Sequence, residues 1–137
     1  MSIPFLLKCL LGVVHSLQSF KEVPSHKEVN PGEEVILPCI INNKAGECRW
    51  EKDGSPVGIY NNKYEWANSN ASEKGDCSLK IKNSSFKYDN GVWQCQVTAS
   101  DFTQKDTLIS DEAELVVKGE YKSNLILSST IFFQLNQ

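Results

Sequence analysis

Short runs of alternating apolar and polar residues recur along most of the chain, and clusters of glycine, proline, asparagine and aspartate separate them. Residues 35–41 alternate in this way, as do residues 77–81, 93–97 and 113–117. Alternation with a period of two gives a strand one apolar face, whereas an amphipathic helix needs a period of about 3.6 residues. The pattern predicts an all-β chain of at least about seven short strands.

The predicted strands must bury their apolar faces against one another. Asp53-Gly54 signals a tight turn between a strand that contains Trp50 and a short returning strand over residues 57–60. The expected loops are the polar stretches 68–75 and 98–105. An antiparallel two-sheet sandwich buries all of these faces, whereas a closed barrel would not explain where the cysteines and tryptophans lie.

Two cysteines and two tryptophans fall at the spacing of an immunoglobulin-like sandwich. Cys39 and Cys95 are expected to link the facing sheets, and Trp50 is expected to pack on their sulfurs. The motif Asp89-x-Gly91-x-Trp93-x-Cys95 closes the pattern, with tryptophan where tyrosine is usual. Without a hydroxyl, this corner depends either on a bond from the indole N–H or on packing alone. The expected core framework comprises Trp50, Leu79, Asp89, Gly91 and Trp93.

The alternation of inward and outward side chains along a strand also pairs the two remaining cysteines of the domain. Cys48 lies two residues before Trp50, and Cys77 lies two residues before Leu79, so both point inward from opposite sheets. Thiols that face each other across a core about 10 Å thick are able to bridge. We predict a second disulfide, Cys48–Cys77; the alternative is two buried free thiols that act as small apolar side chains.

The first 19 residues are expected to form a secretory signal peptide. An apolar run over residues 9–14 is followed by small residues that suit cleavage after Ser16, with Val14 and Ser16 at the −3 and −1 positions, or after Ser19. Removal of this segment would also remove Cys9 and leave an even number of cysteines, as a disulfide-bonded extracellular domain requires. An extracellular location, secreted or on the cell surface, is therefore predicted.

The remaining chain is long enough for one domain. Of its 137 residues, 40% are hydrophobic and 23% are charged, so a core can form. The domain is expected over residues 20–118 and an irregular tail over 119–137, where the alternation is lost. The sequence has no apolar run of about 20 residues, so membrane attachment would require a span in a longer form of the protein.

Composition and motifs exclude several classes of function. The net charge is −3 and the basic residues are scattered, whereas a nucleic-acid partner requires clustered lysine and arginine. The sequence has only two histidines and contains no Ser-His-Asp order, phosphate-binding glycine loop or metal-ligand cluster. We expect no enzymatic activity, cofactor, metal or small-molecule substrate.

Four segments resemble the first immunoglobulin domain of nephrin- and Kirre-type adhesion receptors, particularly the arthropod forms. They are CRWEKDG at 48–54 with Val57-Gly58 after it, KYEW at 63–66, GDCSL at 75–79 and WQCQVTASDF at 93–102. The resemblance covers about residues 20–118 and implies an I-set or V-like sandwich. It also implies binding to the same or a related cell-surface immunoglobulin protein through the exposed C–F–G sheet. Such receptors have several domains and one membrane span, so a fragment, a truncated form or a free-standing secreted relative is expected.

Residues that neighbour the inward positions of these strands must point outward. The expected partner-binding residues are Arg49, Glu51, Gln94, Gln96 and Glu114. The alternative is a solvated face with no role. Long amides suit recognition because they form hydrogen bonds without the desolvation cost of a charge.

Two sequons predict N-glycosylation, at Asn70 and at Asn83. Both lie near loops that flank the strand containing Leu79, so glycans there would cover the opposite sheet and leave the C–F–G face bare. Three functions remain open from the sequence: a cell–cell recognition module, a soluble secreted ligand or decoy, and a structural spacer without a partner.

Overall fold

The computed structural model describes residues 16–68 and 71–119. Most of the expected signal peptide, the sequon asparagine Asn70 and nearly all of the expected tail lie outside these ranges. The folded part includes Gln18 and Ser19, which lie upstream of the expected domain start at residue 20.

The described residues form mainly short strands. The strands are β1 (Ser19–Glu22), β2 (Lys27–Val29), β3 (Val35–Leu37), β4 (Ile40–Asn42), β5 (Cys48–Lys52), β6 (Ser55–Val57), β7 (Tyr64–Trp66), β8 (Leu79–Ile81), β9 (Gly91–Val97), β10 (Leu108–Ile109) and β11 (Ala113–Val117). A 3₁₀ turn, η1 (Ala71–Lys74), and one helical turn, α2 (Phe86–Asp89), complete the elements. The prediction of an all-β chain is confirmed.

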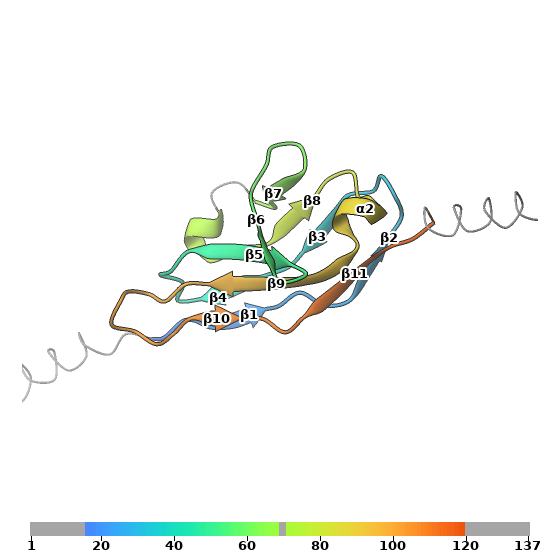
Figure 1. Ribbon diagram of the computed structural model, residues 1–137. Coiled ribbons are helices and arrows are strands. Elements are labelled where there is room, and N and C mark those ends of the chain that lie inside the picture. The colour runs from blue at the N-terminus through green and yellow to red at the C-terminus, as the bar shows by residue number, and fades with distance from the viewer. Residues whose placement is uncertain (1–15, 69–70, 120–137) are drawn as a thin grey trace, which may run out of the picture.

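The strands form two layers, as predicted (Figure 1). One layer has the order β2-β11-β9-β5-β6, with β10 also paired to β9. The other contains β3-β8-β7, and the pair β1-β4 adjoins it through a bridge between Ile40 and Asp76. Pairing is antiparallel except between β2 and β11, which run parallel because the chain crosses from one layer to the other between β1 and β2.

A proline divides the first predicted apolar run. The odd-numbered residues from Val35 to Ile41 are buried, as the alternation predicted. Pro38 lacks an N–H group for the ladder, and the next N–H, that of Cys39, donates to Ser78 Oγ at 3.1 Å. The run therefore becomes two strands, β3 paired with β8 and β4 paired with β1.

The predicted strand over residues 57–60 is wrong in its bounds, because the returning strand is β6. Asp53 and Gly54 both have positive φ, 50° and 80°, as in the tight turns that join strands directly. The chain therefore pairs again at Ser55, and Pro56 is tolerated because β6 is an edge strand. Within the expected loop 68–75, η1 forms one turn of 3₁₀ helix.

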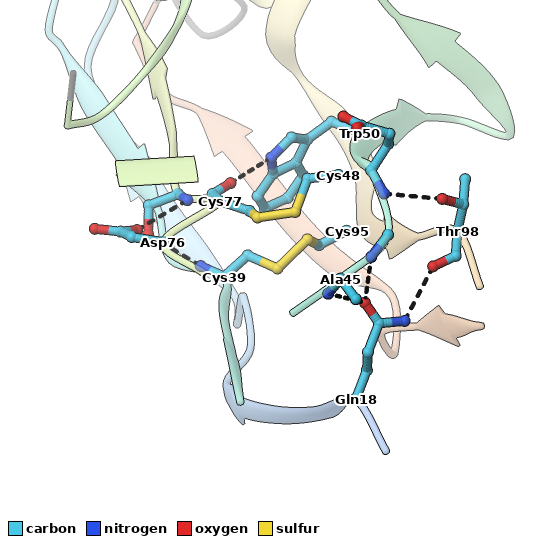
Figure 2. Close-up of a disulfide and its surroundings, with 12 residues drawn as sticks. Gln18, Cys39, Ala45, Cys48, Trp50, Asp76, Cys77, Cys95 and Thr98 are labelled. Carbon is cyan, nitrogen blue, oxygen red and sulfur yellow. Dashed lines mark hydrogen bonds between the residues drawn. A yellow bond between two sulfur atoms is a disulfide. The ribbon is translucent and has the colours of Figure 1, made fainter. Parts of the chain in front are cut away.

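Both predicted disulfides are present. Cys39 and Cys95 bridge the layers with their Cα atoms 6.4 Å apart, and Cys48 and Cys77 do so at 6.2 Å. Trp50 is buried beside both bridges, and its indole Nε1 donates to the backbone oxygen of Cys77 at 2.9 Å (Figure 2). The alternative of two buried free thiols is therefore wrong.

The corner before β9 uses the indole in place of the usual tyrosine hydroxyl. Trp93 Nε1 donates to the backbone oxygen of Asp89 at 3.0 Å, which selects the first of the two alternatives. Gly91 is needed because a Cβ atom there would lie 2.6 Å from the carboxylate of Asp53. Trp50, Leu79, Asp89 and Trp93 are buried in the structure, whereas Gly91 is half-buried.

Candidate functional site

The outer face of β5 and β9 brings together four of the five side chains expected to bind a partner. Arg49 lies opposite Gln96, and Glu51 lies opposite Gln94, in the antiparallel pairing of these two neighbouring strands (Figure 1). Trp50, between Arg49 and Glu51, points into the core, so its neighbours point outward. Arg49 is exposed and the other three are half-buried.

Glu114, the fifth expected residue, lies on the same face but apart from this group. In the pairing of β11 with β9 it is opposite Val92, near the start of β9, whereas Gln96 lies near its end. The Glu114 carboxylate is 3.8 Å from Nδ1 of His26 and both side chains are more than half exposed. Glu114 therefore borders the face at a distance from Arg49.

The two glutamines of β9 differ in their surroundings. The Gln94 amide donates to the backbone oxygen of Ser110 at 3.0 Å, which holds this side chain against the sheet. Among residues 16–68 and 71–119, the Gln96 amide has no hydrogen-bond partner and the Arg49 guanidinium has no ion-pair partner. Arg49 and Gln96 are thus available to bind a partner without breaking an internal contact.

A shallow hollow of about 220 Å³ lies beside Arg49 and Gln96. It is formed by the last residues of β9, the start of the following loop and the residue before β10. Its lining residues are Arg49, Gln96, Val97, Thr98, Ala99 and Thr107. A protruding side chain of a partner could enter this hollow between the two polar groups.

Strand β10 adds an apolar residue that was not predicted from the sequence. Ile109 lies opposite Gln96 and the residue is 60% exposed. Its neighbour Leu108 packs on the core, so Ile109 points outward with Gln96. A two-residue strand is too short to produce a recognisable alternation. The only hint in the sequence is the pair of apolar residues itself, after a polar loop.

Several contacts hold the backbone around the hollow. Glu47 N donates to Thr98 Oγ1 at 2.8 Å, and Thr98 N donates to the backbone oxygen of Glu47 at 3.0 Å. Gly46 lies so close that a Cβ atom there would be 1.9 Å from the Thr98 oxygen. The disulfide at Cys48 ties the start of β5 to the other layer. The Arg49 end of the face is therefore rigid.

A carboxylate fixes the opposite end of the same strand pair. Asp53 accepts from Lys52 Nζ at 2.8 Å and from Val92 N at 2.9 Å. The hydrogen bond from Lys52, then that from Val92, lowers the pKa of Asp53 below its ordinary value, because both favour the ionised form. Hydrogen bonds therefore hold β5 and β9 together at both ends of the four outward-facing side chains.

The sequon residue Asn83 lies away from this face. It follows β8, a strand of the other layer, and its side chain is exposed. Its backbone has a φ of 49°, and its carbonyl accepts from Lys63 Nζ at 3.1 Å. A glycan on Asn83 would therefore extend from the opposite side of the domain.

Clusters of metal ligands, free thiols and membrane-spanning helices are all absent from the described residues. Within residues 16–68 and 71–119, no group of three or more histidine, cysteine or acidic side chains could hold a metal ion. Cysteines in this part of the chain are bonded in disulfides and provide no thiolate. No helix in the described ranges is long and apolar enough to cross a bilayer.

Comparisons with known proteins agree on the family. The immunoglobulin I-set domain matches residues 18–117. Kin of IRRE-like protein 1 of Homo sapiens is 27% identical over 82 residues, which are 58% of this chain and 11% of that protein. The Irregular chiasm C-roughest protein of Drosophila melanogaster is 28% identical over 134 residues, covering 84% of this chain and 17% of that protein.

Solved structures give the same result. The crystal structure of Duf (Kirre) D1 is 30% identical and superimposes with a TM-score of 0.64, covering 73% of this chain and 95% of that one. The similarity to Kirre-type proteins inferred from the four sequence segments is therefore confirmed. The chain spans less than a fifth of the length of the curated relatives that it matches.

Proposed function

The chain belongs to the immunoglobulin I-set family, and we propose that it is an extracellular recognition module that binds a second immunoglobulin-superfamily protein, either its own copy or a relative. The proposed contact surface is the outer face of β5, β9 and β10, which correspond to the C, F and G strands of such domains. One observation carries this proposal: the unpaired Arg49 and Gln96 side chains flank a hollow, with exposed Ile109 beside them.

This combination of side chains suits a protein partner. Protein interfaces combine apolar contacts with hydrogen bonds at a density of about one per 100–200 Å². Arginine is common among residues that dominate binding free energy, because its planar group makes several directed hydrogen bonds over an apolar stem. The Gln96 amide adds a donor and an acceptor at a lower desolvation cost than a charge.

The rigidity of the face supports the same proposal. Binding is weakened when flexible side chains and loops must be ordered, at about 0.5–1.5 kcal/mol for each side chain immobilised. Here two strands in a paired ladder present Arg49 and Gln96, and the Cys48–Cys77 disulfide fixes one strand next to Arg49. Folding therefore orders much of this surface in advance, and binding has to order less of it.

The disulfides and the similar proteins support an extracellular setting. Paired buried disulfides are stable in oxidising compartments and are rare in the cytosol. Likeness to the first domain of Kirre-type proteins supports recognition between cells. This proposal concerns the domain alone, since the chain covers a small part of those relatives.

The double variant Arg49→Ala, Gln96→Ala should reduce adhesion between cells that display the domain. We expect at least a tenfold loss of affinity, about 1.4 kcal/mol or more, because both groups lie at the centre of the proposed contact. Cell aggregation and surface plasmon resonance against the purified domain and its relatives would measure it. Lys80→Ala is the matched control, since Lys80 points outward from β8 in the other layer.

Two outcomes would contradict this proposal. Equal losses from the double variant and from Lys80→Ala would point to a contact elsewhere on the domain. Binding to neither its own copy nor any immunoglobulin-superfamily protein would favour the structural spacer. Circular dichroism of each variant would show that the fold is retained, which is expected because Arg49 is exposed and Gln96 is half-buried.

We further propose that Asn83 carries an N-linked glycan. The secreted protein should lose the mass of one glycan in the variant Asn83→Asp, which tolerates the positive φ of this position. Adhesion should be unchanged in that variant, because the glycan lies on the opposite layer from Arg49. Intact mass spectrometry before and after enzymatic deglycosylation provides the measurement, and an unchanged mass would contradict the prediction.

A further inference from the structure

One glutamine near the start of the described chain acts as a buried connector. The Gln18 side chain, in a residue only 4% exposed, donates from Nε2 to the backbone oxygens of Thr98 and Asp106, both at 3.0 Å. Its Oε1 accepts from Ala45 N and Gly46 N, both at 2.8 Å. Figure 2 shows the Gln18 amide between Ala45 and Thr98. All four hydrogen-bonding positions of the amide are therefore used.

These contacts join three distant parts of the sequence. Residues 45–46 belong to the turn that leads into β5, while Thr98 and Asp106 lie at either end of the loop between β9 and β10. The backbone N–H of Gln18 also faces the Asp106 carboxylate, at 3.5 Å. Without Gln18, the buried Gly46 N–H and Asp106 C=O groups and the part-buried Ala45 N–H and Thr98 C=O groups would lose a partner. The loss is most unfavourable for the two buried groups, because water reaches them least.

Cleavage after Ser16 and cleavage after Ser19 would leave the mature domain with different N-terminal residues. A cut after Ser19 would delete Gln18 together with Ser19, the first residue of β1. A cut after Ser16 would keep both and leave Leu17 first. Ser16 and Leu17 are exposed, and the cut would remove none of the contacts of Gln18. Signal peptidase acts before folding, so the difference concerns which product is able to fold.

The surroundings of Leu17 also suit a new chain end. A hollow of about 480 Å³ is lined there by Ser16, Leu17, Asn43, Lys44, Ala45, Ser100, Asp101, Gln104 and Asp106. Its charged lining residues are Asp101, Asp106 and Lys44, that is, two carboxylates and one ammonium group. A positively charged α-amino group on Leu17 would therefore be favoured next to it.

We propose that signal peptidase hydrolyses the bond between Ser16 and Leu17, because the fold requires Gln18 in the mature protein. Water adds across the amide, leaving a carboxylate on Ser16 of the released peptide and an ammonium group on Leu17 of the domain. Val14 and Ser16 then occupy the −3 and −1 positions, where this enzyme accepts small side chains. This inference shares the secretory route with the proposed function but does not depend on the binding face.

Secretion of the full chain from cultured insect cells tests the cleavage directly. N-terminal sequencing and intact mass of the protein from the medium should give a single start at Leu17. A folded, disulfide-bonded product that starts at Phe20 would overturn the proposal. Protein that keeps residues 1–16, in the medium or in the cells, would also overturn it.

Two matched variants separate the candidate sites. Ser16→Leu places a large residue at −1 and should abolish the product that starts at Leu17. Ser19→Leu should leave that product unchanged, because Ser19 is exposed and lies outside the recognised positions. The reverse pattern would show that cleavage follows Ser19.

The need for Gln18 is testable on its own. Gln18→Ala should lower the melting temperature by at least about 5 °C, because two buried and two part-buried backbone groups lose a partner. Gln104→Ala is the control and should leave it nearly unchanged, since Gln104 is exposed. An unchanged melting temperature in Gln18→Ala would contradict the physical basis of the proposal.

Discussion

Replacing Cys39 and Cys95 together by alanine should lower the free energy of unfolding by about 4 kcal/mol. The bridge closes a loop of 56 residues, which restricts the unfolded chain strongly. Both cysteines are fully buried between the layers, so the variant also loses packing against Trp50. Such a loss is a large part of the 5–15 kcal/mol by which a domain is ordinarily stable. Denaturation by urea, followed by tryptophan fluorescence, would measure it.

The second disulfide provides the matched comparison. The double variant Cys48→Ala, Cys77→Ala opens a loop of 29 residues, so the entropic loss should be smaller, about 3.5 kcal/mol. Cys48 is also only half-buried, so less packing is lost. A larger loss from this second pair than from the first would contradict the predicted order. A loss below about 1 kcal/mol from either would show that the bridge adds little to stability.

The variant Asp89→Ala should destabilise the domain by about 3 kcal/mol. The Asp89 side chain is 0% exposed and accepts from Lys63 Nζ at 2.5 Å, Tyr64 Oη at 2.7 Å and Ser85 N at 2.8 Å. Removing the carboxylate takes one acceptor from each of three donors, and Ser85 N then has no other acceptor among the described residues, whereas Lys63 Nζ and Tyr64 Oη each keep at least one. The loss is limited because Lys63 is 27% exposed and is able to turn toward water.

Thermal unfolding would show this effect as a fall of more than about 10 °C in melting temperature. Asp111→Ala is the control, because Asp111 is an exposed aspartate of the same domain and should change little. Tyr64→Phe removes only one of the three donors and should cost about 1 kcal/mol. A result for Asp89→Ala no larger than that for Tyr64→Phe would contradict the role assigned to the carboxylate.

Alkaline pH provides an independent readout of the same network. Burial, and then the hydrogen bond to Asp89, raise the pKa of Tyr64 above its ordinary value of about 10. As pH rises above about 10, the unfolded chain releases this proton while the folded chain retains it, so stability falls. The fall should be shallower in Asp89→Ala, where one cause of the raised pKa is gone.

Strand parity explains why so much of the fold was predictable. A period of two fixes which side chains share a face of a strand. Cys48 and Cys77 could therefore be paired from their sequence separation from Trp50 and Leu79 alone. The same rule placed Arg49 and Gln96 on the outer face, and the structure confirms that position. Their role in binding stays a prediction, because exposure alone does not identify a partner.

Features with no extended local pattern, or that depend on contacts between distant segments, were not predictable. The bounds of β6 follow from the turn at Asp53 and Gly54, and β10 is too short to produce a pattern. Gln18 lies within the expected signal peptide, and its burial results from two loops that close over it. No local pattern in the sequence announces such a contact.

The sequence by itself determined the all-β class, the two disulfides and the inward and outward faces, because alternation and cysteine spacing act through local geometry. Only the tertiary structure decided that Asp89 receives three donors, that Trp93 uses its indole N–H, and that Gln18 belongs to the domain. The physical reason is that a buried polar group is satisfied by whichever donors or acceptors the folded chain brings within about 3 Å.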